Sequence, residues 1–252
     1  MMQGVGLVLA GSFGNGSYQI GVWKALREFG IDQNITALAG ASVGAFNAVL
    51  FIQGDYSIAE KLWIDMDGDK TFTVGIRNLM GSMGARGLSF KKNYGMELFS
   101  RQGLESLIDE NVDLDGLGNS AMDFFVTAYN PDQKRVEYFK TKGESPPRIK
   151  KILLAAAAQP FGFGAEEIEG EVYVDAGGAG NVPIKPLYDR GIRHFVVITG
   201  GDDYPVRAEE FLDANIIEIA AGSDGHSGSG KQDKRKGPGR NEIRVMPRRC
   251  KS

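Results

Sequence analysis

The first 54 residues repeat one pattern: a short uncharged apolar run, a turn containing glycine, and a longer apolar segment. The runs VGLVLA (5–10) and ITALAG (35–40) have the length of buried strands. SYQIGVWKALREFG (17–30) carries apolar residues at helical spacing, and VGAFNAVLFIQG (43–54) is apolar on nearly every face, as a buried helix is. Two consecutive strand–turn–helix units predict an α/β fold with parallel strands.

The remainder of the chain continues this alternation. Apolar periodicity predicts further strands at 121–129, 135–140, 171–174, 193–199 and 215–220, and helices around 97–110, 148–158 and 184–190. The segment 65–96 is rich in Gly and Met and has weak periodicity. Two interpretations of it stay open, a mobile flap over a site and an irregular surface insertion.

Charge is distributed unevenly along the chain. Residues 225–252 hold nine Lys and Arg against Asp233 and Glu242, a net charge of +7, which leaves −10 on the rest. The Gly/Ser/Lys-rich composition from residue 222 onward is typical of a flexible tail. The tail is either a solvated end or a means of adhesion to an anionic membrane surface. An acidic body with a basic tail does not indicate a nucleic-acid-binding domain.

Several classes of protein are disfavoured by composition. The single cysteine, Cys250, excludes an internal disulfide and a Cys-based metal cluster, and it fits a reducing compartment, so we expect a cytoplasmic protein. The start, MMQGVGLVLAGSFGNG, lacks a basic region before its apolar run, and we expect no signal peptide. The uncharged run 33–54 contains three glycines and several polar residues, which favours a buried strand and helix over a membrane span.

Ser42 is the first candidate for chemistry. It stands in the pattern G-x-S-x-G, as GASVG (40–44), between a predicted strand and a predicted helix, which is the context of a nucleophile elbow. Gly40 and Gly44 suit a tight turn in which side chains would clash. At a helix N-terminus, backbone N–H groups and the helix dipole favour developing negative charge. A small serine that only packs at the turn is the alternative.

A nucleophilic serine needs a base, and the chain has only two histidines, His194 and His226. We interpret both as non-catalytic, because one borders a predicted strand and the other lies in the Gly/Ser stretch. Asp175 is the strongest remaining base, since it ends the strand EVYV and leads into AGGAG (176–180). Ordinary turn formation by Asp-Ala-Gly-Gly and a histidine-dependent esterase both stay open.

A glycine loop joins the first predicted strand to the first helix, and it consists of Gly11, Ser12, Phe13, Gly14, Asn15 and Gly16. Its backbone N–H groups can form an oxyanion hole. A phosphate cradle for a nucleotide is the rival interpretation. It is disfavoured because no acidic residue ends the second strand and no Lys-Ser/Thr pair follows the loop.

Three segments, in this order, resemble the patatin-like phospholipase family: LVLAGSFGNGSYQIGVWKAL (7–26), GASVGAFNA (40–48) and YVDAGGAGNVPI (173–184). LLAAAAQPFGFG (153–164) is similar to the family's alanine-rich helix and Pro-Phe turn. The likeness implies a three-layer α/β/α sandwich with a mostly parallel central sheet. We therefore predict a catalytic domain over 4–221 and a flexible basic tail over 222–252.

The resemblance also implies a mechanism, a Ser–Asp dyad that hydrolyses acyl esters of lipids without histidine, metal or cofactor. Carried to this chain, Ser42 attacks the ester carbonyl and Asp175 accepts its proton. The resemblance implies that backbone N–H groups near Ser12, Phe13 and Gly14 hold the oxyanion, with that of Val43 as a further candidate donor. The motif glycines are Gly40, Gly44 and Gly177.

The glycine loop departs from the family pattern, which has three glycines, a variable residue, a basic residue and a glycine. This chain has Ser12, Phe13 and Asn15 in place of two glycines and the basic residue. Loss of one oxyanion donor typically lowers the rate by about 10²–10³. A weakly active or silent relative that binds lipid or a protein partner is therefore the alternative to a lipid acyl hydrolase.

Overall fold

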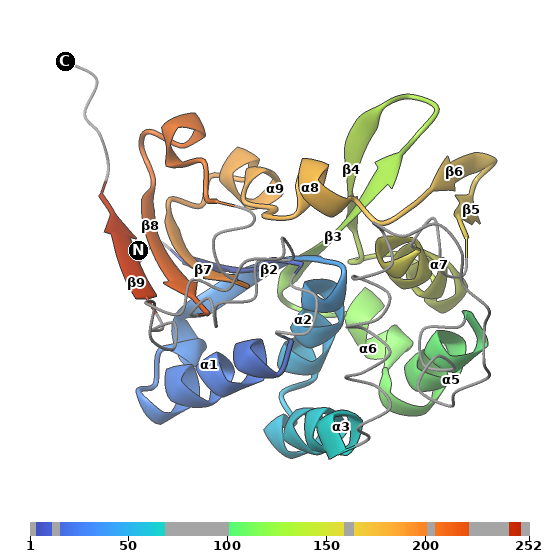
Figure 1. Ribbon diagram of the computed structural model, residues 1–252, viewed down its shortest axis with the longest axis horizontal. Helices are drawn as coiled ribbons and strands as arrows, with labels where there is room; N and C mark the ends of the chain where they lie inside the picture. The colour runs from blue at the N-terminus through green and yellow to red at the C-terminus, as the bar shows by residue number, and fades with distance from the viewer. Residues whose placement is uncertain are drawn as a thin grey trace, which may run out of the picture.

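The computed structural model describes residues 4–11, 16–68, 101–158, 164–200, 205–221 and 242–247. Within them, seven strands form one sheet in the order β4-β3-β2-β1-β7-β8-β9 (Figure 1). The strands are β1 (Val5–Leu9), β2 (Ile35–Ala41), β3 (Asp123–Asn130), β4 (Arg135–Lys140), β7 (His194–Thr199), β8 (Asn215–Ala220) and β9 (Glu242–Met246). The five inner strands run parallel, and β4 and β9 pair antiparallel to them at the two edges. The predicted mostly parallel sheet is confirmed.

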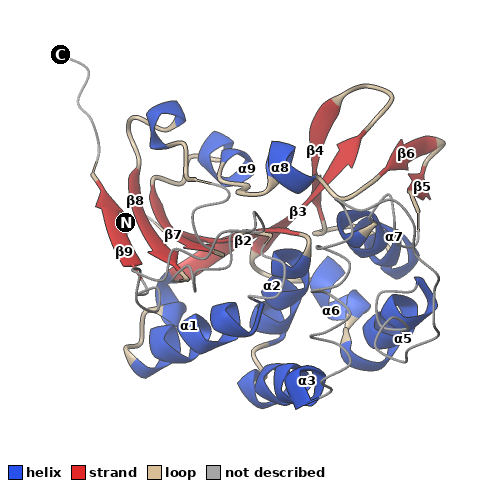
Figure 2. Ribbon diagram, viewed as in Figure 1, coloured by secondary structure: helices blue, strands red, loops and turns tan. Residues whose placement is uncertain are grey.

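Helices cover both faces of this sheet (Figure 2). The longer ones are α1 (Gly16–Glu28), α2 (Val43–Gln53), α3 (Tyr56–Gly68), α5 (Arg101–Asn111) and α7 (Pro146–Ala157), and the short ones are α6 (Leu114–Gly118), α8 (Gly177–Gly180) and α9 (Lys185–Asp189). In Figure 1, α8 and α9 lie above the sheet, and α1, α2 and α6 lie below it. This is the expected α/β/α sandwich.

The core is divided by the sheet. The larger part includes Leu7, Leu38 and Phe124, all with no exposed surface, and packs under α1, α2 and α7. The smaller part packs under α9 and includes Ile184 and Phe195. Each fully buried side chain of this size contributes about 1.5–3 kcal/mol relative to an exposed one. Seven of the eleven residues of α2 are buried and the other four are half-buried, which suits a run, 33–54, without a charged side chain.

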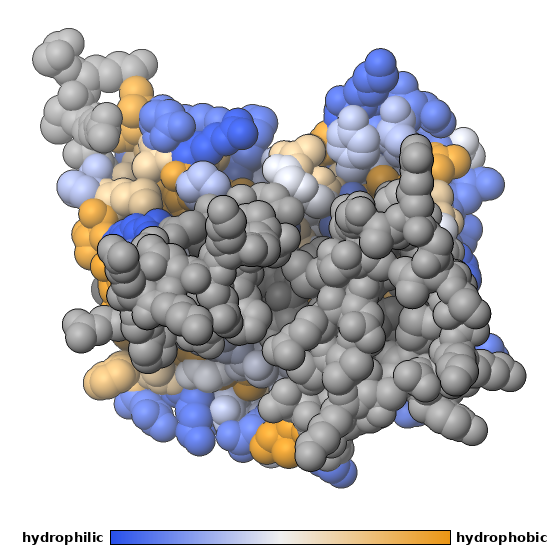
Figure 3. Space-filling view, in the orientation of Figure 1, coloured by the Kyte–Doolittle hydropathy of each residue, from blue (hydrophilic) through white to orange (hydrophobic). Residues whose placement is uncertain are grey.

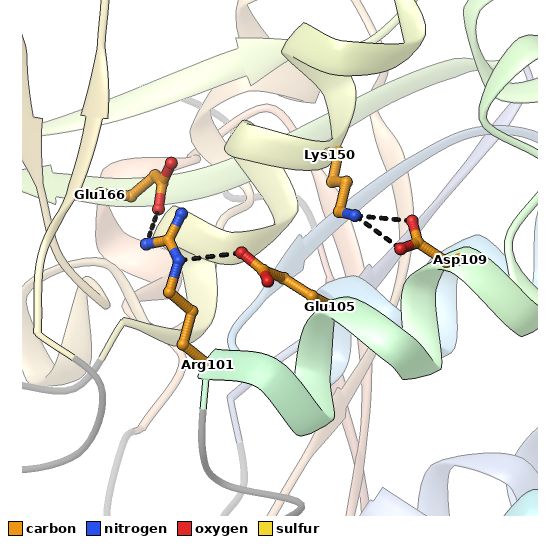
Figure 4. Close-up of polar contacts among 5 residues, drawn as sticks. All are labelled: Arg101, Glu105, Asp109, Lys150 and Glu166. Atoms are coloured by element: carbon orange, nitrogen blue, oxygen red, sulfur yellow. Dashed lines mark hydrogen bonds and ion pairs between the residues drawn. The ribbon is translucent and has the colours of Figure 1, made fainter.

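Ion pairs attach α5 to the neighbouring elements (Figure 4). The Arg101 guanidinium contacts Glu105 on its own helix at 2.8 Å and the buried carboxylate of Glu166 at 2.5 Å. Glu166 opens a small hairpin of β5 (Glu166–Ile168) and β6 (Glu171–Tyr173). Lys150 of α7 contacts Asp109 of α5 at 2.6 Å. These contacts hold α5 against α7 and the hairpin that leads to Asp175.

Two regions correct the sequence-based expectations. Residues 242–246 were expected in the flexible tail but form β9, which pairs along its whole length with β8. The alternation in EIRVM is a strand pattern that the surrounding basic residues obscured. Residues 56–68 form α3, so the first four residues of the segment 65–96, which was expected to be irregular, are helical. Most of that segment, and most of the tail, lie outside the described residues.

Candidate active site

Ser42 occupies a sharp turn between β2 and α2. Its backbone has φ of 51° and ψ of −129°, a combination that a residue with a side chain rarely adopts. The turn is closed by the N–H of Ala45, which donates to the Ser42 carbonyl at 2.9 Å. Ser42 is half-buried at the N-terminus of α2. Strained backbone of this kind concentrates at functional sites, and it agrees with a nucleophile elbow.

The two glycines around Ser42 are needed for close backbone approach. A Cβ on Gly40 would lie 2.6 Å from the Ala45 Cα atom, and one on Gly44 would lie 2.2 Å from the Leu9 carbonyl oxygen. Neither glycine has a positive φ, and the strained residue is the serine itself. The pattern G-x-S-x-G therefore lets α2 start directly against β1 and β2.

Gly44→Ala is expected to destabilise the fold by about 1–3 kcal/mol or more, because the new methyl group would overlap backbone of β1. Gly21→Ala is the matched control, since Gly21 lies inside α1 and a Cβ there would meet no atom within 4 Å. Removing a mid-helix glycine should stabilise by about 0.5–1 kcal/mol. Urea unfolding of the three proteins measures both effects. Equal stability of Gly44→Ala and wild type would contradict the close approach.

Asp175 lies at the end of a short extended segment that touches β3. The preceding residue, Val174, exchanges two backbone hydrogen bonds with Tyr129, at 2.8 and 2.9 Å. The Asp175 N–H donates to the Ala158 carbonyl at 2.8 Å, and its carboxylate accepts the Gly177 N–H at 2.9 Å. The Asp175 side chain is thereby fixed at the start of α8, where Gly177 has φ of +47°.

Strand register brings Ser42 and Asp175 to the same end of the sheet. Ala41, which precedes Ser42, pairs with Thr127 of β3, and Val174, which precedes Asp175, pairs with Tyr129 two residues further along β3. Both candidate groups therefore follow residues anchored to the carboxyl end of one strand. In open α/β sheets, that end is where binding crevices form.

The start of the glycine loop contacts both parts of the site. The N–H of Gly11 donates to the Asn181 carbonyl at 3.1 Å, and the Asn181 side-chain amide donates to the Gly11 carbonyl at 2.6 Å. A Cβ on Gly11 would lie 2.1 Å from the Asn181 Oδ1 atom and 3.2 Å from the Ser42 Cβ atom. Gly11 thus lies against Ser42, tied to the segment that follows Asp175. The predicted oxyanion residues Ser12, Phe13, Gly14 and Asn15 lie outside the described residues.

A buried polar network fastens both ends of the glycine loop to α2. Asn47, 2% exposed, donates to the Gly16 carbonyl at 3.0 Å and to the Gln19 side chain at 2.8 Å. Gln19, 1% exposed, donates to the Ala10 carbonyl at 2.7 Å. Trp63 of α3 donates to the Asn47 Oδ1 atom at 2.9 Å. Asn47 of α2 therefore holds Gly16, the last residue of the loop, directly, and Ala10, the residue before the loop, through Gln19.

Sequence reasoning missed four residues of this site: Gln19, Asn47, Trp63 and Asn181. Asn47 carried a usable signal, because a lone amide inside a buried apolar helix must find partners. Asn181 lies within the aspartate segment but has no distinctive spacing of its own. Trp63 had no sequence signal, because its hydrogen bond to Asn47 forms only when α3 packs on α2.

The two histidines fit a catalytic role poorly. His194 begins β7 and pairs with Val5, the first residue of β1, so it lies at the opposite end of the sheet from Ser42. Its ring Nδ1 is 3.3 Å from the side-chain amide of Asn215. His226 lies outside the described residues.

Within the described part of the chain, no three residues among His, Cys, Asp and Glu are grouped as metal ligands would be. In the same residues, no helix combines the length and the apolar character that crossing a membrane requires.

Comparison with known proteins agrees with this architecture. The profile of the family described as "Patatin-like phospholipase" matches residues 7–188, most of the chain, and the protein therefore belongs to the patatin-like phospholipase family. The resemblance drawn from the three sequence segments is confirmed. Membership of this family supports hydrolysis of lipids as the general function.

Individual relatives are more distant. The lysophospholipase NTE1 of Cryptococcus neoformans var. neoformans serotype D, from strains JEC21 and B-3501A, is 26% identical over 199 residues, or 79% of this chain. The matched part is 11% of each relative, so this chain spans about a tenth of their length. Among solved structures, VipD from Legionella pneumophila aligns with 82% of this chain and 51% of its own, with a TM-score of 0.49 and 16% identity.

Proposed function

We propose that the protein is a serine acyl hydrolase that cleaves carboxylic esters of lipids through Ser42 and Asp175. The observation that carries the proposal is the strained Ser42 turn at the N-terminus of α2, with Asp175 at the same end of the sheet. Family membership agrees with it, and so does the similarity to a lysophospholipase, which makes single-chain phospholipids the first substrates to test.

The proposed reaction has two stages. The Ser42 hydroxyl attacks the ester carbonyl while the Asp175 carboxylate accepts its proton, and the tetrahedral intermediate collapses as that proton passes to the leaving alcohol. Water, activated by the same carboxylate, then hydrolyses the acyl-enzyme. The hydrogen bond from Gly177 orients the Asp175 carboxylate for both stages.

Stabilisation of the oxyanion is assigned to backbone N–H groups. One proposed donor is the backbone N–H of Val43, the first residue of α2, because the helix dipole favours negative charge at a helix N-terminus. The glycine loop is the proposed source of the other donors, because its first residue, Gly11, lies against Ser42 and its last, Gly16, is bonded to α2. The substitutions at Ser12, Phe13 and Asn15 keep a silent, lipid-binding relative as the second candidate function.

We propose the cytoplasm as the location of this activity. The single cysteine cannot form a disulfide within the chain, and proteins without disulfides are typical of that reducing compartment. The substrate is a lipid or another acyl ester, and no nucleic acid takes part. The basic residues of 222–252 are proposed to favour peripheral contact with anionic membranes.

A fluorophosphonate probe tests the proposed function directly. We expect it to label the folded wild type on the peptide that contains Ser42, and not to label Ser42→Ala. The double variant His194→Ala/His226→Ala should be labelled as the wild type is, and should keep its turnover of p-nitrophenyl butyrate and lysophosphatidylcholine. Folded wild type without labelling would favour the silent relative. Loss of turnover in the histidine variant would favour a histidine-dependent esterase.

A further inference from the structure

The apolar face of the sheet continues beyond the helices that cover it. One row of paired residues runs from Leu7, fully buried, through Val196 and Ile217 to Val245, which is 68% exposed. A second row runs from Leu9, 3% exposed, through Ile198 and Ile219 to Ile243, which is 70% exposed. Residues directly opposite one another in a sheet share a face. Each row therefore starts in the core under α1 and ends in solvent on β9.

The outer ends of these rows form a patch that we call the edge strip: Ile217, Ile219, Ile243 and Val245. Figure 3 shows apolar surface at the left side of the molecule, where β8 and β9 lie in Figure 1. The opposite face of the same strands is covered, because Ile216 packs in the smaller part of the core and Glu218, which is buried, accepts from Thr199 at 3.0 Å and pairs with Arg244 at 3.7 Å. Exposed apolar patches of this kind mark interaction surfaces.

We propose that the edge strip docks the protein on an anionic lipid surface. Charge favours this occupant. Basic residues stand on both sides of β9 in the sequence, with Lys234, Lys236 and Arg240 before it and Arg248, Arg249 and Lys251 after it. Arg240 is two residues from the start of β9 and Arg248 two from its end. Apolar residues with adjoining Lys and Arg are the combination that binds the interface of anionic bilayers.

A second copy of the chain is the occupant that charge disfavours. Strand β9 is the outermost strand of the described sheet, so two copies could pair edge to edge. That arrangement would also bring together two basic segments, each carrying the +7 net charge of residues 225–252, and like charges repel. An anionic lipid surface suits both parts, because the apolar side chains can enter the bilayer interface and the basic residues are attracted to the lipid headgroups.

The edge strip reaches the end of the sheet at which Ser42 lies. Ile243 belongs to the row of Leu9, which pairs with Gly40 two residues before Ser42. Four strand spacings separate β2 from β9, or about 20 Å across the sheet. Ile219 and Ile243 lie at the end of the sheet where the parallel strands terminate, as Ser42 does. A lipid surface bound to these two residues would thus lie near the candidate active site. This step rests on the proposed function, whereas docking itself does not.

Vesicle flotation with the full chain tests the docking. Wild type and Ser42→Ala are expected to bind vesicles of phosphatidylcholine with about 30% phosphatidylglycerol, and to bind pure phosphatidylcholine at least tenfold more weakly. Ile243→Ser/Val245→Ser should lower binding to the anionic vesicles at least tenfold, and salt of about 0.5 M should weaken the binding of the wild type. Ile64→Ser, on α3 and 63% exposed, is the matched control and should bind as the wild type does.

Activity gives an independent measurement. The strip variant should hydrolyse soluble p-nitrophenyl butyrate at the wild-type rate and lose at least tenfold on lipid in anionic vesicles. Equal vesicle binding by strip variant and control would overturn the docking. So would light scattering that shows a wild-type dimer converted to a monomer by the strip variant, because a second copy would then be the occupant. Wild type that binds vesicles through the strip but hydrolyses no ester would overturn the proposed function alone.

Discussion

Ser42→Ala is expected to lower the rate of ester hydrolysis by roughly 10⁴-fold or more, because removing the nucleophile of a serine hydrolase lowers kcat by at least that factor. The substitution removes one oxygen and leaves the turn intact, since the Ala45 N–H bonds the backbone carbonyl of residue 42. The rate is measured with p-nitrophenyl butyrate, and circular dichroism confirms the fold. Hydrolysis within tenfold of the wild type would show that Ser42 is a packing residue.

Asp175→Asn belongs to the same test, because an amide cannot accept the serine proton. Its side-chain oxygen can still accept the Gly177 N–H, which keeps the local structure and isolates the chemical role. We expect a loss of roughly 10³-fold or more, which is typical when the acidic member of a catalytic triad is replaced by its amide. Asp132→Asn, an exposed turn residue, is the matched control and should leave the rate unchanged. A rate for Asp175→Asn equal to this control would contradict its role as base.

The fold was predictable where local pattern and tertiary structure agree. The runs at 5–10 and 35–40 became β1 and β2, because a continuous apolar segment of that length can be buried only as an inner strand or a core helix. The strand β9 was not predicted. Its five residues do alternate as a strand does, but the run is short and stands in a basic Gly-rich stretch, so that only its pairing with β8 distinguishes it from the tail.

The candidate site divides in the same way. Ser42 and Asp175 were predictable because each stands in a short segment with characteristic glycines at fixed spacing. Asn181 was not, since its partner Gly11 is 170 residues away and nothing in the local sequence encodes that contact. Contacts between distant segments depend on register, and register here is fixed by the sheet as a whole.

Asn47→Leu is the second change with a large expected effect, and it tests how the glycine loop is held. Asn47 satisfies the Gly16 carbonyl, the Gln19 side chain and the Trp63 N–H, all within the described core. Leucine has a similar size but removes these three hydrogen bonds, and the loss of one partner of a buried hydrogen bond costs about 1–3 kcal/mol. The sum, on the order of 3–6 kcal/mol, is a large part of the stability of a typical domain.

The matched control for this change is Asn34→Ala, because Asn34 is exposed and donates to the Gly30 carbonyl at 3.5 Å. It should alter stability by less than about 0.5 kcal/mol. Urea unfolding followed by circular dichroism compares the two variants with the wild type. Asn47→Leu with the stability of the control would mean that the network contributes nothing beyond packing.

Catalysis should respond to Asn47 even in the fraction that stays folded. Asn47 holds Gly16 directly and orients the Gln19 side chain that holds Ala10, so its loss loosens the attachment of the loop that is proposed to hold the oxyanion. We expect kcat to fall between about 10- and 10³-fold, with little change in KM, because an oxyanion hole acts on the transition state and not on the bound ester. Affinity for a trifluoromethyl ketone, which mimics the tetrahedral intermediate, should fall in parallel with kcat/KM. An unchanged kcat in folded Asn47→Leu would separate the network from catalysis and leave it the task of joining α1, α2 and α3.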